Sequence, residues 1–177
     1  MAEFEHLCGL GVFGGIDREH ERFELIGGEI VPMNAKGIWH ETLKVDLNRY
    51  WSKTLSGDVA MAQATTLHLD AHQFLEPDFF FWPSAVSLAD IACTKSLLIV
   101  EVADSSFAYA AGRKAALYAG FGARDYWVIN ARTRATTIHR DPASEGFKTI
   151  VTHAPDATLV PALLPALAIR LADLPAR

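Results

Sequence analysis

The chain has 177 residues, of which 50% are hydrophobic and 21% charged, a composition typical of a globular protein with a sizeable core. Its formal net charge of -5 gives no support for a strongly basic nucleic-acid-binding protein, although it does not exclude a local positive cleft. No signal-peptide pattern opens the chain, and no run approaches the roughly 18–20 apolar residues of a membrane span, so we expect a cytoplasmic protein without a membrane partner.

Residues 1–20 are rich in glycine, and we expect an irregular lead-in there, followed by a single domain over residues 21–177. The lead-in contains a formal GxGxxG between Gly9 and Gly14. A dinucleotide-binding fingerprint needs a strand before it and a helix after it, and neither pattern is present. The sequence therefore predicts no nucleotide cofactor.

The first half of the chain alternates strand and helix patterns. Two short strands over residues 23–33 flank Gly27-Gly28, a strong signal for a β-hairpin. Apolar residues at helical spacing predict an amphipathic helix over residues 38–55, and loose alternation predicts a strand over residues 59–69. A short and very apolar strand is expected over residues 78–82.

The second half continues this alternation. After a connecting region with a short helix at residues 88–92, residues 97–103 form an apolar run typical of a strand buried on both faces. An Ala-rich helix follows over residues 107–121, preceded by side chains that can cap it, and strands are predicted at residues 126–129 and 135–139. The fold class is therefore α/β, with a central mixed β-sheet flanked by helices and preceded by an N-terminal β-hairpin.

Three ionisable residues stand where packing favours apolar ones. Asp78 begins an apolar strand, Glu101 interrupts another, and Lys114 lies on the apolar face of the 107–121 helix. Strand alternation places both carboxylates on one face of neighbouring strands, a suitable site for a hard divalent cation such as Mg²⁺. A nearby lysine could orient or deprotonate water and offset phosphate charge. The structural alternative is that Asp78 caps a turn while Glu101 and Lys114 form a buried ion pair.

A set of short motifs in a fixed order carries a resemblance to a known family. These are Glu24 in Phe-Glu-Leu-Ile-Gly-Gly-Glu-Ile, Pro77-Asp78, Ile99-Val100-Glu101-Val102, Lys114-x-x-x-Tyr118 and Asp125-Tyr126-Trp127-Val128-Ile129. Over about residues 21–141 the chain resembles the Uma-two family, restriction-endonuclease-like proteins of the PD-(D/E)XK nuclease superfamily. His40 also falls where members of this family often have a histidine.

The resemblance implies a restriction-endonuclease-like fold, often in a homodimer, that hydrolyses DNA phosphodiester bonds with Mg²⁺ or Mn²⁺. It assigns Asp78 and Glu101 as metal ligands, Lys114 as the catalytic lysine and Glu24 as a supporting acid. Two positions depart from the family pattern. Ala103 stands where the simplest motif has lysine, a role that Lys114 takes from the helix, and Ala110 stands where members often have aspartate.

Two other functions stay open at the level of sequence. The acidic net charge and Ala110 favour a catalytically weakened nuclease-fold module that binds or regulates, whereas the intact Asp-Glu-Lys set favours the nuclease. A metal-dependent hydrolase of a small phosphoester is the third possibility. A positively charged cleft around Asp78 would favour the nuclease. A narrow, closed pocket would favour the hydrolase of a small phosphoester, and a site filled by side chains would favour the binding module.

Other patterns carry less information about function. His68 and His72 would suit a zinc pair on a helix, but in a strand they stand roughly 13 Å apart. Cys8 and Cys93 lack CxxC spacing and are expected to be reduced thiols. The aromatic residues Trp82, Tyr126 and Trp127 are expected in the core, and the basic residues of the C-terminal half are expected at the solvated surface: Arg113, Arg124, Arg132, Arg134, Arg140 and Lys148.

Overall fold

The computed structural model describes residues 22–33, 35–70 and 72–175, so the expected lead-in, the GxGxxG and Cys8 lie outside the described residues. The strands are β1 (Phe23–Ile26), β2 (Glu29–Pro32), β3 (Val59–Gln63), β4 (Leu67–Asp70), β5 (Gln73–Leu75), β6 (Phe79–Pro83), β7 (Leu98–Ala103), β8 (Asp125–Asn130), β9 (Thr136–Ala143), β10 (Gly146–His153), β11 (Thr158–Leu159) and β12 (Ile169–Arg170). The main helical segments are α2 (Ile38–Thr54), α3 (Phe107–Tyr109), a π-helical turn (Ala110–Lys114) and α4 (Ala115–Gly120).

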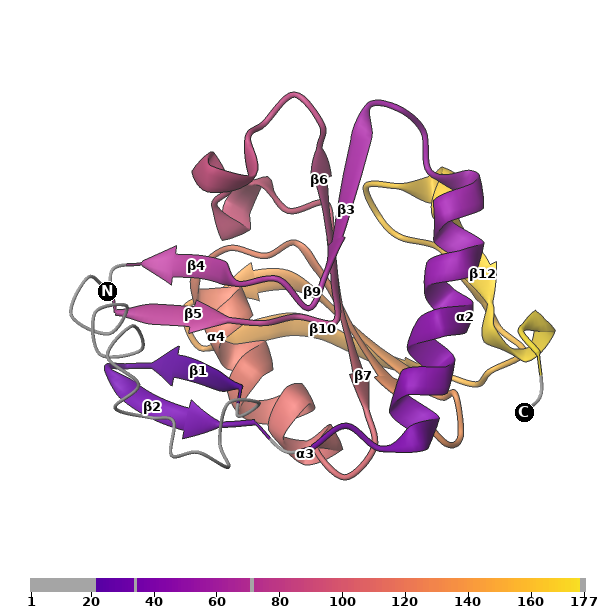
Figure 1. Cartoon of the computed structure of the whole chain (residues 1–177), viewed down its shortest axis with the longest axis horizontal. Helices are drawn as coiled ribbons and strands as arrows, with labels where there is room; N and C mark the ends of the chain where they lie inside the picture. Colours follow the sequence, from indigo (N-terminus) through magenta and orange to yellow (C-terminus); the bar gives the residue numbers. More distant parts are fainter. Residues whose placement is uncertain (1–21, 34, 71, 176–177) are drawn as a thin grey trace, which may run out of the picture.

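A six-stranded mixed sheet, in the order β10-β9-β8-β7-β6-β3, forms the centre of the molecule. Its β7 and β8 are parallel and are joined by the helical segment over residues 107–120, whereas the other neighbouring strands are antiparallel. Figure 1 shows α2 on one side of β7, and α3 and α4 on the other. The predicted fold class, a central mixed sheet flanked by helices, is therefore confirmed. None of the helices in the described residues has the length and apolar character that a membrane crossing needs.

The predicted hairpin is present, and its turn explains why two glycines occur there. Gly27 and Gly28 have φ angles of 61° and 81°, a left-handed pair that a two-residue hairpin turn requires and that glycine adopts without steric cost. The hairpin belongs to a second sheet, antiparallel, in the order β2-β1-β5-β4. This small sheet brings Glu24, in β1, next to the central sheet.

Helix α2 begins and ends close to the predicted positions. It buries Leu43, Leu47 and Trp51 in a core cluster that also contains Phe79 and Phe81. Both of these phenylalanine rings meet Trp51 edge-on at centroid distances of 5.2 Å. Burial of this apolar face fixes α2 against the sheet and thereby fixes the direction in which its first turn points.

The predicted strand over residues 59–69 is wrong as a single element. The chain breaks at Ala64, whose φ is 47° and whose N–H donates to the carbonyls of Pro77 and Asp78. Strand β3 joins the central sheet and β4 joins the small sheet, because this bend sends the two halves in different directions. Strand β5 and the long β10 were not predicted, since β5 is short and β10 exposes five of its eight residues without alternation.

The predicted helix over residues 107–121 is present but not uniform. It contains a π-helical turn that ends at Lys114, a local irregularity often found at functional sites. Capping by the preceding side chains was a wrong prediction. Ser106 makes no side-chain cap hydrogen bond, and Asp104 pairs instead with Arg132 at 2.6 Å.

Candidate active site

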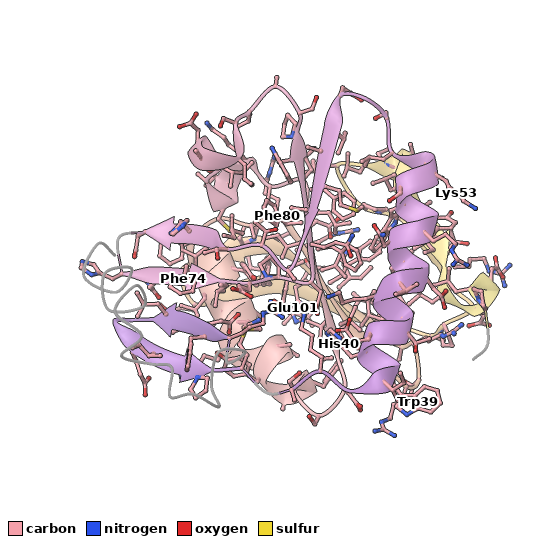
Figure 2. All side chains as sticks on the ribbon, viewed as in Figure 1. Trp39, His40, Lys53, Phe74, Phe80 and Glu101 are labelled. Atoms are coloured by element: carbon pink, nitrogen blue, oxygen red, sulfur yellow. The ribbon has the colours of Figure 1, made fainter. Side chains whose placement is uncertain are left out.

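A pocket of about 210 Å³ lies where β7, the start of α2 and the hairpin meet. Its lining includes all four residues that the sequence predicted for the site, which are Glu24, Asp78, Glu101 and Lys114, together with His40. Figure 2 shows His40 on the side of α2 that faces the sheet, Glu101 near the centre of the molecule, and Trp39 pointing away. Pockets that enclose a drug-sized ligand measure roughly 300–1,000 Å³, so this one suits a smaller group.

Asp78 lies immediately before β6 and directs its carboxylate toward α2. Its Oδ2 accepts hydrogen bonds from the backbone N–H of Val102 at 2.9 Å and from His40 Nε2 at 3.0 Å. Its Oδ1 pairs with Lys36 Nζ at 2.9 Å, and Lys44 Nζ lies 3.8 Å from the same oxygen. Strand alternation predicted that Asp78 and Glu101 face one way. Asp78 precedes its strand, and apart from the Val102 N–H of β7 its partners come from α2 and from the segment before α2.

Glu101 lies on β7 and pairs with the helix on the other face of the sheet. Lys114 Nζ stands 2.8 Å from Glu101 Oε1 and 2.7 Å from Glu24 Oε1, so one ammonium group bridges two carboxylates. The hydroxyl of Tyr118 donates to the same Glu101 oxygen at 3.3 Å, and Tyr109 donates to Glu24 Oε2 at 3.4 Å. The side chains of Glu24, Glu101 and Lys114 are all less than 10% exposed.

These contacts perturb the acids in opposite directions. Burial works to raise the pKa of Asp78, but hydrogen bonds and positive charge from His40 and Lys36 outweigh it and hold that pKa well below its usual range. Burial raises the pKa of Glu101 to about 7; Lys114 works against this, while the negative charges of Asp78 and Glu24 add to it. Burial works to lower the pKa of Lys114, but its two carboxylate partners outweigh it and raise that pKa, so Lys114 is a cation at neutral pH.

The donor chemistry of the pocket fits a divalent cation held by few protein ligands. No group of three or more His, Cys, Asp or Glu side chains in the described ranges could hold a metal ion by itself. Mg²⁺, however, usually binds through one or two carboxylates with waters and phosphate oxygens. Burial is the main cause of the raised pKa of Glu101, to which the negative charges of Asp78 and Glu24 add, and its hydrogen bonds from described residues all reach Oε1. Asp78 and Glu101 both line the pocket and supply carboxylates of the kind that such an ion takes.

Sequence reasoning missed several residues of the site. Lys36 lies between β2 and α2, in a position without periodicity, so no sequence signal could have identified it. Lys44 follows His40 by one helical turn, and that i, i+4 spacing on α2 could have indicated it. Glu24 is positioned by the backbone N–H of Glu76, which donates to Glu24 Oε1 at 3.1 Å, and Arg22 pairs with Glu76 in turn.

The other candidates lie apart from the pocket or in the core. His68 and His72 are exposed, and Asp70 uses its carboxylate to accept the backbone N–H of His72 at 2.7 Å. Several basic residues make protein contacts: Arg113 with Glu29, Arg132 with Asp104, Arg134 with backbone carbonyls, and Arg140 with Asp125. The three aromatic residues predicted for the core are buried, each below 10% exposure: Trp82, Tyr126 and Trp127. Cys93 is a buried free thiol.

Comparisons with known proteins place the chain in a family and show a fold that it shares. The family model described as "Uma2: Putative restriction endonuclease" matches residues 1–172. A crystal structure of "a putative nuclease belonging to DUF820" from Anabaena variabilis aligns with a TM-score of 0.65 and 14% identity, covering 85% of this chain and 88% of that one, and it shows a shared fold. The type IIG restriction endonuclease BpuSI aligns with a TM-score of 0.42 and 18% identity over 62% of this chain and 12% of that one, too low a score to carry an argument. No curated protein matches significantly.

Proposed function

The chain belongs to the Uma2 family, whose model covers residues 1–172, and on this premise we propose that it is a metal-dependent endonuclease that hydrolyses DNA phosphodiester bonds. The family assignment supports nuclease function. The observation that carries the proposal is the convergence of Glu24, Asp78, Glu101 and Lys114, from four separate segments, on one pocket. Because the pocket is small, only a backbone phosphate enters it and the rest of the DNA lies across its mouth.

Asp78 and Glu101 are the residues proposed to hold Mg²⁺ or Mn²⁺ between them. When bound, such an ion polarises the phosphate and lowers the pKa of a coordinated water. The protein contributes a fixed ligand geometry, because the Val102 N–H and His40 hold Asp78 from one side and Lys114 and Tyr118 hold Glu101 from the other.

Lys114 supplies positive charge and hydrogen-bond donors at the reacting phosphate. Water forms a new P–O bond as the bond to the leaving oxygen breaks, and negative charge grows on the remaining phosphate oxygens. Lys114 is an ammonium held by two carboxylates, so it can orient the attacking water and offset this charge. Glu24 is a positioning residue in this scheme, because it acts on Lys114 at 2.7 Å.

A cleavage assay on supercoiled plasmid DNA, with Mg²⁺, with Mn²⁺ and with a chelator, tests the proposal. We expect metal-dependent nicking or linearisation that Asp78→Ala abolishes and that Asp90→Ala, a change at an exposed aspartate outside the pocket, leaves intact. Cleavage by Asp78→Ala at the parent rate would show that the assigned role is wrong.

A non-catalytic DNA-binding module is the second candidate. The observation that favours it is the saturation of Asp78, whose two oxygens are already paired with Lys36, His40 and a backbone N–H. This candidate predicts retention of DNA without metal and no cleavage under any of the three conditions, so the same assay with a gel-shift measurement separates the two functions.

The resemblance implies a homodimer, and we include that in the proposal. Its support in the structure is β10, the strand at one end of the central sheet, which exposes Ile150 and Val151 at 57% and 46%. A long exposed edge strand with apolar side chains is a template for pairing with another chain. Sedimentation velocity of the parent and of Ile150→Lys would test it, with loss of the dimer expected in the variant.

A further inference from the structure

Lys36 makes the contact in the pocket that is hardest to reconcile with a bound metal. Its ammonium lies 2.9 Å from Asp78 Oδ1, and its side chain is 19% exposed against 5% for that of Asp78, so Lys36 is the more exposed member of the pair. Lys36 comes from the connection between β2 and α2, and not from a helix or strand. Lysine carries its charge on a flexible four-carbon stem, so its ammonium can reach more than one partner.

The two oxygens of Asp78 differ in how firmly they are engaged. Oδ2 accepts from the backbone of β7 and from His40, two groups fixed by the sheet and by α2. Oδ1 is engaged by lysine side chains, Lys36 at 2.9 Å and Lys44 at 3.8 Å. If the carboxylate binds a divalent ion, Oδ1 is the oxygen free to do so, since Oδ2 is committed to rigid donors.

A divalent ion and an ammonium group compete for this oxygen. Both are cations that would approach the same carboxylate at contact distance, where like charges repel strongly in a partly buried site. Lys44 cannot simply take the place of Lys36, because it already lies beside the same oxygen and beside Glu41. Lys36 would therefore have to leave Asp78 for the metal to bind, and a phosphate that enters the pocket would offer its ammonium a new anionic partner.

From this geometry we propose that Lys36 is an exchangeable internal cation. It neutralises Asp78 in the metal-free protein, yields Oδ1 to the divalent ion, and then pairs with a phosphate oxygen of the DNA backbone. This inference rests on the proposed function, which it deepens by assigning Lys36 as a metal competitor and a phosphate contact. The two roles predict opposite effects of one substitution, which a merely structural role would not produce.

The first experiment is calorimetric titration of Mn²⁺ into the full chain, without DNA and at constant ionic strength. We expect Lys36→Met to bind Mn²⁺ on the order of ten-fold more tightly than the parent, because the competing charge is gone. Lys36→Arg keeps the charge and Lys53→Met removes a charge at the far end of α2, so both are expected to bind like the parent. Equal or weaker binding by Lys36→Met, or no binding by it at all, would overturn the inference.

The second experiment measures binding of a labelled DNA duplex by fluorescence anisotropy in the presence of Ca²⁺. Lys36→Met is expected to bind DNA several-fold more weakly than Lys53→Met, which matches it in net charge. Binding equal to that of Lys53→Met would refute the phosphate contact. Both readouts are binding constants, so they stand even if the parent cleaves nothing, and a failure of the proposed endonuclease activity is distinguishable from a failure of this inference. Lys36→Gln, with thermal unfolding as a folding check, provides a second neutral variant.

Discussion

Two buried carboxylate sites in the central sheet look alike in sequence and differ in structure. Asp125, at the start of β8, is 1% exposed and accepts hydrogen bonds from Trp127 Nε1 at 2.9 Å, from Arg140 Nε at 3.0 Å and from the backbone N–H of Ala162 at 2.6 Å. The carboxylate of Asp125 therefore has one positively charged partner, the Arg140 guanidinium, and two neutral hydrogen-bond donors. Asp125 does not line the pocket.

The pocket holds an arrangement of the opposite kind. Glu24 and Glu101 share one ammonium, that of Lys114, and the negative charge of Asp78 adds to the raised pKa of Glu101. Burial of an acid is therefore not in itself a sign of function, since Asp125 is more completely buried than Glu101. The informative feature is one ammonium shared by two buried carboxylates, at a site that lines a pocket.

Glu24, Glu101 and Lys114 together form the shared-ammonium site. The largest effect is expected from Lys114→Met, because it leaves the two buried carboxylates of this site without their cation. We expect metal-dependent DNA cleavage to fall by at least ~1,000-fold and the free energy of unfolding to fall by about 3–5 kcal/mol at pH 8. Lys114 works against the burial that raises the pKa of Glu101, so without the ammonium that pKa rises further, in the folded state only. The loss of stability should therefore be smaller at pH 5.5, where the folded state binds the extra protons.

Urea unfolding at the two pH values measures this effect, and Lys148→Met, at an exposed position on β10, is the matched control. A stability loss that is the same at both pH values would contradict the assignment of a shared ammonium. Cleavage at the parent rate would remove Lys114 from the mechanism.

Asp125→Ala tests the other side of the comparison, with an expected loss of about 3 kcal/mol in unfolding free energy. The substitution leaves the Trp127 indole N–H and the Ala162 amide without their acceptor, while Arg140, which is 32% exposed, can turn to solvent. Below its unfolding temperature the variant should bind Mn²⁺ with the parent affinity. A selective loss of Mn²⁺ binding in a protein that is still folded would show that the two sites are coupled.

Much of the fold followed from the sequence because strong local signals agreed with the tertiary structure. The Gly27-Gly28 turn, the apolar spacing of α2 and the apolar run of β7 around Glu101 each specified one element. The prediction failed where one residue redirected the chain, as at Ala64, and where an element lacked a pattern, as in β10. A bend stabilised by a distant partner leaves no local signal in periodicity.

The site was predictable to the extent that its residues violated local packing rules. Glu101 in an apolar strand and Lys114 on an apolar helix face predicted a close pair, and the structure places their charged atoms 2.8 Å apart. Glu24 came from the family resemblance alone. Lys36 and Tyr109 could not be predicted, because they enter the pocket through the meeting of distant segments; their roles, like those of the predicted residues, are proposals.

Glu101→Gln should change stability in the opposite direction from most substitutions of buried groups. Burial raises the pKa of Glu101 to about 7 in the folded protein from 4.5, so the folded state binds its proton more tightly than the unfolded state does. This acid therefore costs stability as pH rises from about 4.5 to 7, and the cost is complete above that range. We expect Glu101→Gln to be more stable than the parent at pH 8 by about 1–2 kcal/mol, and to lose this advantage near pH 5.

Thermal unfolding in a chelator across this pH range measures the effect, and Glu145→Gln, on the turn between β9 and β10, is the control. A variant that is less stable than the parent at pH 8 would mean that the attraction between Glu101 and Lys114 exceeds the cost of burial. In that case the pocket would resemble the Asp125 site, as a balanced structural pair.

The smallest effect is expected from Tyr109→Phe, which removes the weakest contact of the shared-ammonium site. The Tyr109 hydroxyl donates to Glu24 Oε2 at 3.4 Å, near the limit of a hydrogen bond, whereas the bonds to Asp125 from Trp127 and Ala162 are 2.9 and 2.6 Å. The loss in unfolding free energy should stay below about 1 kcal/mol. A loss as large as that of Asp125→Ala would mean that the Tyr109 hydrogen bond holds Glu24 firmly. A small loss would leave Lys114 and the Glu76 N–H as the principal restraints on Glu24. Urea unfolding of the two variants side by side makes this comparison, and a small loss would indicate that the oxygen of Glu24 facing Tyr109 is free to take a water or a ligand.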